Sequence, residues 1–237
     1  MEQRDPPRGE RIFTGPMSDV GACPRCGGPV TKPPDEAAGY ICAWHGEVPP
    51  LQPFRHPDAE LLESSARDSR EPFWVLWPPP AGWVVTGVGR VGERAEAVRA
   101  TVVALGGPNP LGGAGELLIV AEEPGIGLGA RYAGLLGPDP GVRFGIGAPD
   151  GRVLTDGHPT PLWYVETAPD RAAYAGEAAG RWLWLIFHPG TAGTLLVENL
   201  ELADARVLGP EVRQLSFGAL TPRVTEQLDE PRRPDLF

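Results

Sequence analysis

The chain has 237 residues, 41% of them hydrophobic, and a formal net charge of -10. This length suits one small module plus one domain of ordinary size. The acid excess argues against nucleic acid as a partner, because phosphates require a basic surface, and no apolar run approaches the roughly 18 to 20 residues of a membrane span. Since no charged-then-apolar signal sequence is present either, we expect a soluble, cytoplasmic protein.

Residues 1–17 are the first segment, and we expect a disordered extension there. They are polar, carry two adjacent prolines and lack hydrophobic periodicity. Met17 offers an alternative start just before the cysteines. We therefore expect the folded part to begin at residue 18.

The three cysteines of the chain all lie within residues 18–48, together with one histidine. Their order is Cys23-Pro-Arg-Cys26, fifteen residues, then Cys42-Ala-Trp-His45. Two such pairs, each on a tight turn, have the spacing of a zinc ribbon whose last ligand is histidine. Four protein ligands close a tetrahedral sphere, so we predict one structural zinc ion per chain, which supplies the folding free energy of this short module.

Other uses of these cysteines stay open at the level of the sequence. A redox dithiol would be expected beside a βαβ pattern, and none begins here. A disulfide would leave one cysteine over, and nothing points to an oxidising compartment. Free structural cysteines are a further alternative. His56 could also replace His45 as fourth ligand, although three prolines lie between it and Cys42.

A short hairpin completes the expected ribbon. Val30–Thr31 and Tyr40–Ile41 fit two strands, with Pro33–Glu36 as an exposed connection. Acidic side chains outnumber the two basic ones of this module, Arg25 and Lys32. We therefore expect a protein partner, and no nucleic acid, on the exposed face of the ribbon.

Residues 49–70 are expected to form a proline-rich linker and a short helix. The segment Pro49–Pro53 is stiff because three of its five residues are proline. The apolar residues of Asp58–Ser69 recur at helical spacing. The simplest role of this element is to lay the ribbon against the body.

We expect a mainly β body in residues 71–222. We expect a flexible, charged tail in residues 223–237. Short apolar runs bounded by glycine and proline predict strands. The candidates are Phe73–Trp77, Gly82–Val91, Ala97–Leu105, Gly115–Ala121, Val142–Ile146, Pro161–Glu166, Arg181–His188, Thr194–Asn199, Ala205–Leu208 and Val212–Phe217. Asp170–Ala179 favours a short helix, and Ala97–Leu105 could also be helical. Because long crossover helices are missing, we predict an antiparallel β-sheet or sandwich with one or two short helices.

The body has a narrow catalytic inventory. After residue 70 it contains no cysteine, no lysine and one serine, Ser216. This excludes a cysteine nucleophile, a Schiff-base lysine and a P-loop lysine, and Ser216 lacks the G-x-S-x-G context. The glycine-rich stretch Glu122–Ala130 follows a predicted strand, but Gly134 ends any helix almost at once, which favours an ordinary turn over a dinucleotide-binding loop.

The best candidate for a functional cleft is the run Asp156-Gly-His158-Pro-Thr160. A small enzyme could use His158 and Asp156, with carboxylates such as Glu122 and Glu123, for acid–base chemistry. A loop histidine in a tight turn is the plain alternative. Both interpretations stay open from the sequence.

The run Arg181–His188 predicts a central strand. Alternation places Trp182, Trp184 and Ile186 on one face together with His188, and the remaining apolar residues on the other. Both faces are apolar, so we expect the strand to be covered on both sides and its tryptophans to belong to the core.

Six motifs are spread along the chain: Cys23-Pro-Arg-Cys-Gly27, Cys42-Ala-Trp-His-Gly46, Gly125-Ile-Gly-Leu-Gly-Ala130, His158-Pro-Thr-Pro-Leu-Trp163, Asp170-Arg-Ala-Ala-Tyr-Ala-Gly-Glu177 and Trp182-Leu-Trp184. Together they resemble an uncharacterised actinobacterial family, a domain of unknown function with an N-terminal zinc ribbon, over about residues 17–223. The resemblance implies that ribbon and β body form one unit, and it implies no established activity. A phosphotransacetylase label carried by similar proteins has no support in the size or alternation of this body.

Three functions are compatible with these features. The leading hypothesis is a non-enzymatic protein whose structural zinc ribbon sits on a mainly β domain and which binds a protein or small ligand. The main alternative is a small enzyme built on Asp156 and His158. The third is a nucleic-acid adaptor, which would need a basic ribbon face that the sequence scarcely provides.

Overall fold

The computed structural model describes residues 21–32, 39–94, 97–221 and 223–224. The predicted N-terminal extension and the predicted hairpin connection Pro33–Glu36 lie outside these residues. Of the predicted tail, only residues 223 and 224 are described, and Val224 is buried in the core.

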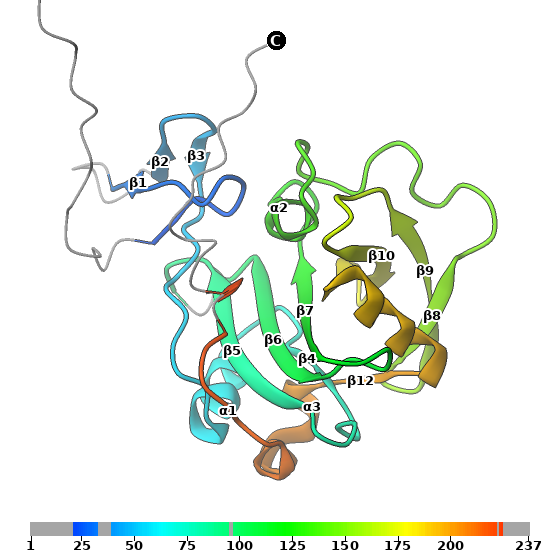
Figure 1. The fold of residues 1–237 in the computed structure, drawn as a ribbon. Coiled ribbons are helices and arrows are strands. Elements are labelled where there is room, and N and C mark those ends of the chain that lie inside the picture. Colours follow the sequence, from blue (N-terminus) through cyan, green and yellow to red (C-terminus); the bar gives the residue numbers. More distant parts are fainter. Residues whose placement is uncertain (1–20, 33–38, 95–96, 222, 225–237) are drawn as a thin grey trace, which may run out of the picture.

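The N-terminal module contains a small antiparallel sheet. Its strands β1 (Val30–Thr31), β2 (Tyr40–Cys42) and β3 (Gly46–Val48) lie in that order. Figure 1 shows this module beside one end of the body. The chain then enters the body through Leu51, which pairs with Ala22 of the module on one side and with Val91 of the body on the other.

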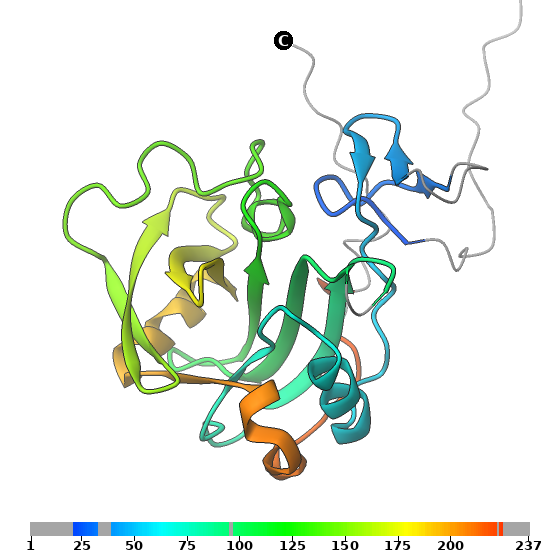
Figure 2. The same ribbon diagram turned by 180° about the vertical axis from the view of Figure 1, so that it is seen from behind.

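In the part of the chain that the structure describes, the body is a single curled sheet of nine strands (Figures 1 and 2). Their spatial order is β4-β12-β8-β9-β10-β11-β7-β6-β5. All neighbours are antiparallel except β8 and β12, which are parallel. The strands are β4 (Trp74–Leu76), β5 (Val84–Val91), β6 (Ala100–Pro108), β7 (Ala114–Glu122), β8 (Gly151–Thr155), β9 (His158–Val165), β10 (Ala172–Ala178), β11 (Arg181–His188) and β12 (Glu201–Asp204). The predicted mainly β fold is confirmed.

Short helices cover the sheet. They are α1 (Ala59–Arg67), α2 (Leu128–Ala133), α3 (Ala205–Leu208) and the 3-10 helices η2 (Gly190–Glu198) and η3 (Gly209–Gln214). The predicted helix in Asp58–Ser69 is confirmed as α1, and Asp58 caps it by accepting a hydrogen bond from the Leu61 N–H at 2.7 Å. Within the described residues, none of the helices is both long and apolar enough to cross a membrane.

Strand β11 lies in the middle of the sheet and is buried on both faces, as predicted. Leu183, Leu185 and Phe187 belong to the apolar cluster that also contains residues of α1, α3 and η3. Trp184 and Ile186 belong to the cluster on the opposite face, which α2 covers. Sequence alternation therefore placed these side chains correctly, because a strand with two apolar faces requires cover on both.

The prediction of a helix in Asp170–Ala179 is wrong, since these residues form β10. Alanine favours a helix in isolation, but hydrogen-bonded pairing with β9 and β11 makes this segment a strand. The small side chains serve the packing: Ala175 is paired with Trp184, and a Cβ on Gly176 would lie 2.6 Å from the Pro161 carbonyl oxygen. Small side chains in β10 therefore allow close packing against the neighbouring strands.

Four predicted strands are also wrong. Val142–Ile146 forms turns. Thr194–Asn199 and Ala205–Leu208 are wholly or largely covered by the short helices η2 and α3, and the first half of Val212–Phe217 belongs to η3. Strands β8 and β12 were missed, because glycine, arginine and acidic residues interrupt their apolar pattern. In all of these segments the hydrophobic runs are too short to separate a strand from a helical turn.

Candidate metal centre

The first ligand pair sits on a tight turn that precedes β1. The Gly27 N–H donates to the Cys23 carbonyl at 2.8 Å, and Gly27 adopts a φ of 74°, which suits glycine. The Gly28 N–H points at the Cys26 Sγ at 3.4 Å. This turn brings both thiols of the pair to one side of the chain.

The second pair is delivered by the β2–β3 hairpin. Cys42 is the last residue of β2, and His45 lies in the turn before β3. Gly46 follows with a φ of 68°, again a conformation that favours glycine. Both halves of the predicted site therefore come from turns next to the small sheet.

The four side chains converge on one point. The ligand atoms of Cys23, Cys26, Cys42 and His45 all lie within 4.8 Å of one another. A zinc ion about 2.3 Å from sulfur and 2.0 to 2.1 Å from nitrogen sets tetrahedral edges of about 3.8 Å between sulfurs and about 3.6 Å between sulfur and nitrogen. The observed separations are 3.7 Å between the sulfurs of Cys26 and Cys42, and 3.6 and 3.7 Å from the His45 Nδ1 to the sulfurs of Cys23 and Cys42. The cluster has the dimensions of a metal site, with Nδ1 as the histidine ligand.

Most of the thiols at the site have pKa values that disfavour the thiolate form unless a cation is bound. Burial raises the pKa of the Cys23 thiol to about 12 and also raises that of Cys26. Burial acts the same way on Cys42, but hydrogen bonds from the backbone N–H groups of Trp44 and His45, together with those from the side chains of Cys23 and Cys26, outweigh it and lower the pKa of that thiol. A bound divalent ion would deprotonate the coordinating thiols. Its positive charge would also offset the cost of burying three thiolates next to one another.

His45 is neutral in this setting. Burial lowers its pKa, and the nearby Arg25 guanidinium acts in the same direction. Neutral imidazole is the form that binds metal. His56 is exposed and does not belong to the cluster, and the three cysteines are free thiols and form no disulfide.

The metal-site turn also contacts the body, which the sequence did not indicate. Arg25, between the two cysteines of the first pair, donates from Nη2 to the Gly125 carbonyl at 2.6 Å and from Nε to the Ile126 carbonyl at 3.4 Å. Lys32 forms an ion pair with Glu93 at 2.5 Å. The glycine-rich stretch after β7 is thus the platform on which the ribbon rests.

That platform is held by a buried carboxyl group. Glu122 is fully buried at the end of β7 and accepts hydrogen bonds from the N–H groups of Leu128 and Gly129 at 2.7 and 3.1 Å. Burial raises its pKa to about 8. Gly129 lies so close to Trp184 that a Cβ would be 2.2 Å from the indole. The glycines of this loop serve packing and backbone geometry.

Asp156 and His158 lie in the hairpin between β8 and β9. His158 is exposed, and its Nδ1 is 3.0 Å from the Asp156 carbonyl oxygen. The Asp156 carboxylate accepts a hydrogen bond from the Asp204 N–H at 3.0 Å. Glu122 is buried beneath α2, and Glu123 pairs with Arg99 at 2.5 Å. The catalytic use of these residues stays a prediction.

His188 belongs to the interior of the body. It is buried at the end of β11, and burial together with the neighbouring guanidinium groups of Arg223 and Arg171 lowers its pKa to about 4. The imidazole is therefore neutral at physiological pH. This matches its predicted place on the covered face of a central strand.

A family model for a family of unknown function, DUF6758, matches residues 17–224. The chain belongs to this family. The match extends over the small sheet, the linker and the nine-stranded sheet, so it spans the Cys/His cluster of this chain as well as the body. No curated protein and no solved structure matches the chain.

Proposed function

We propose that this member of the DUF6758 family is a non-enzymatic binding protein of the cytoplasm, in which a structural zinc ribbon is presented to a protein partner by the β body. The observation that carries the proposal is the closed ligand set. Around a bound ion, three thiolates and one imidazole would fill a tetrahedral sphere, which would leave no position for a substrate or an activated water. Soft sulfur ligands with one imidazole suit zinc, and unpaired thiols suit a reducing compartment.

The exposed face of the ribbon supports a protein partner. Trp44 is 48% exposed and Ile41 40% exposed, and both flank the ligand Cys42. Tryptophan is enriched at the centres of protein interfaces because it buries a large area with little loss of side-chain freedom. An apolar pair held in place by a metal-bound turn offers a rigid contact for such a partner.

The charge distribution argues against nucleic acid on this module. Arg25 donates to backbone carbonyls of the body, and Lys32 pairs with Glu93. Both basic side chains of the described part of the ribbon therefore point to the body. Phosphate neutralisation requires free basic groups on the exposed face.

The proposal is tested by metal analysis and by capture of partners from the native host. We expect one zinc per chain, and a partner that is captured by the wild type and lost with Trp44→Ala. Tyr164→Ala is the matched control, because Tyr164 is an aromatic side chain of the body that is also 48% exposed. Equal capture by both variants, or purified protein that contains no zinc and keeps an ordered ribbon, would contradict the proposal.

A further inference from the structure

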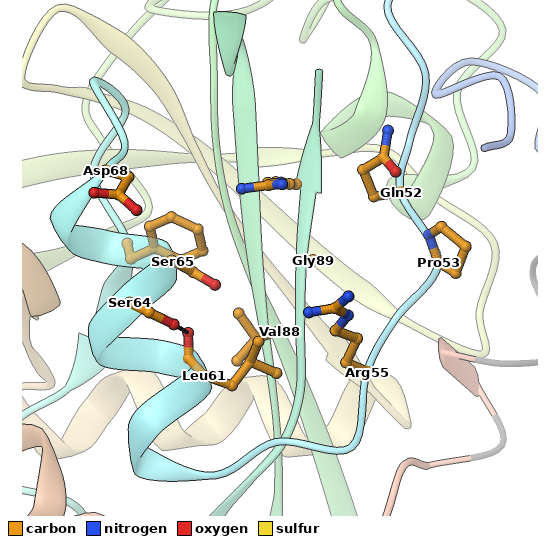
Figure 3. A pocket seen from close by; sticks show the side chains of 11 residues that line it. Gln52, Pro53, Arg55, Leu61, Ser64, Ser65, Asp68, Val88 and Gly89 are labelled. Carbon is orange, nitrogen blue, oxygen red and sulfur yellow. Dashed lines mark hydrogen bonds between the residues drawn. The ribbon is translucent and has the colours of Figure 1, made fainter. Parts of the chain in front are cut away.

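A hollow on the body, away from the metal cluster, has the features of a site for a small molecule. It lies between the linker, α1 and β5, and its volume is about 390 Å³. Figure 3 shows Gln52 and Arg55 on the linker side, Ser64 and Ser65 on the α1 side, and Val88 of β5 between them. This volume is within the range of roughly 300 to 1,000 Å³ that is typical of ligand pockets.

Two arginines line the hollow. Arg90 lies on β5 two residues after Val88, so both side chains are on the sheet face that α1 covers. Arg55 lies on the linker directly opposite Val88, with which it forms a bridge. Across the part of the chain that the structure describes, no hydrogen-bond or ion-pair partner is found for either guanidinium group. Two unpaired positive charges therefore share one concave surface.

The remaining lining offers hydrogen bonds and an apolar floor. The Ser64 hydroxyl donates to the Leu61 carbonyl at 3.1 Å and keeps its capacity to accept. Ser65 and Gln52 also line the hollow. Phe73 and Val88 are 0% and 5% exposed and form the floor. Few polar groups above a buried apolar base are the usual composition of a small-molecule site.

We propose that this hollow binds a small molecule through a carboxylate or phosphate group held by Arg55 and Arg90. A guanidinium group presents donors in a planar fork that matches either oxyanion, and charge-assisted hydrogen bonds of this kind are stronger than neutral ones. Asp68 is the one acidic residue of the lining. It opposes a second negative charge and so favours ligands with a single anionic end.

Occupation of the hollow would join two parts of the molecule. Arg55 and Gln52 belong to the linker that leaves the ribbon, whereas Arg90 and the serines belong to β5 and α1. A bound oxyanion would therefore fasten the linker to the body. This site is separate from the proposed protein contact at Trp44 and does not depend on it.

The test is calorimetric titration of the zinc-loaded full chain, at constant ionic strength, with inorganic phosphate in one arm and butyrate, which has a single carboxylate, in the other. We expect saturable binding with one site in at least one arm, and the arm that binds more tightly identifies the oxyanion. Arg55→Gln and Arg90→Gln should each weaken that binding by roughly tenfold or more, as expected for loss of one charged hydrogen-bond donor.

Two further variants separate a site from general charge effects. Asp68→Asn should tighten binding severalfold, because it removes the only negative charge of the lining. Arg152→Gln removes an exposed arginine of β8 outside the hollow and should leave the affinity unchanged. Absence of saturable binding in both arms, or equal weakening by Arg152→Gln and by the two lining variants, would overturn the proposal.

Discussion

The ribbon and the body of this protein are held together by different means. Among the described residues of the ribbon, the buried apolar cluster has five members, and three of them are the cysteines of the candidate metal site, Cys23, Cys26 and Cys42. The body has two extensive clusters, one on each face of its nine-stranded sheet. A module this small cannot bury enough surface to fold alone, whereas the body can. The fold of the ribbon therefore depends mainly on the spacing of a few Cys and His residues. The fold of the body depends on many packing contacts between apolar side chains.

Removal of the metal should break the ribbon and spare the body. In Cys23→Ser/Cys26→Ser, or in the wild type with a strong chelator, we expect complete loss of ribbon structure, since structural zinc contributes roughly 10 to 16 kcal/mol of apparent binding free energy in such modules. Amide NMR spectra would show collapse of the resonances of β1 to β3 while those of β11 stay dispersed.

The control for this experiment is Ser216→Ala, a conservative change in the body that leaves every metal ligand in place. It should leave zinc content and ribbon spectrum as in the wild type. Simultaneous unfolding of ribbon and body on chelation would show that the two regions are not energetically distinct.

The same difference explains what the sequence could predict. The four side chains that the structure brings together as a candidate metal site were predicted from their spacing alone, because coordination chemistry restricts both the residue types and their separation. The central strand β11 followed from alternation. The helical prediction for β10 failed because pairing with β9 and β11 overrides the preference of alanine. The contact of Arg25 with Gly125 and Ile126 joins residues about a hundred positions apart, and no local pattern encodes it.

The stability of the body can be tested through Glu122, which is not one of the candidate metal ligands. Its pKa is raised from 4.5 to about 8 by burial, so the folded state keeps its proton up to about pH 8 while the unfolded state loses it near pH 4.5. The stability that this group contributes is therefore fully present below about pH 4.5 and is lost as the pH rises to about 8. Glu122→Gln should flatten this decline, which amounts to a few kcal/mol at about 1.4 kcal/mol per unit of pKa difference.

Urea unfolding of both proteins across this pH range measures the effect. The amide oxygen of Gln can still accept from the Leu128 N–H, but its NH2 group cannot accept from the Gly129 N–H, so the variant keeps one of the two hydrogen bonds to α2. Near pH 4 the variant should be the less stable protein because it lacks one hydrogen bond, and between about pH 4.5 and 8 the difference should shift in favour of the variant. Parallel curves at all pH values would show that the Glu122 carboxyl does not titrate in this window.

The smallest effect concerns the contact between the two regions. Arg25→Ala removes two hydrogen bonds to backbone carbonyls of the body and should cost about 1 to 2 kcal/mol, without loss of zinc, because Arg25 is not a ligand. Lys32→Met, in contrast, breaks an ion pair whose side chains are 42% and 44% exposed, and such a pair contributes little to stability because water and salt screen it. Backbone NMR relaxation would report faster independent motion of the ribbon in Arg25→Ala than in Lys32→Met. If both variants behave like the wild type, the backbone pairing of Leu51 with Ala22 and Val91 is sufficient to hold the ribbon, and the orientation of Trp44 is set by the linker alone.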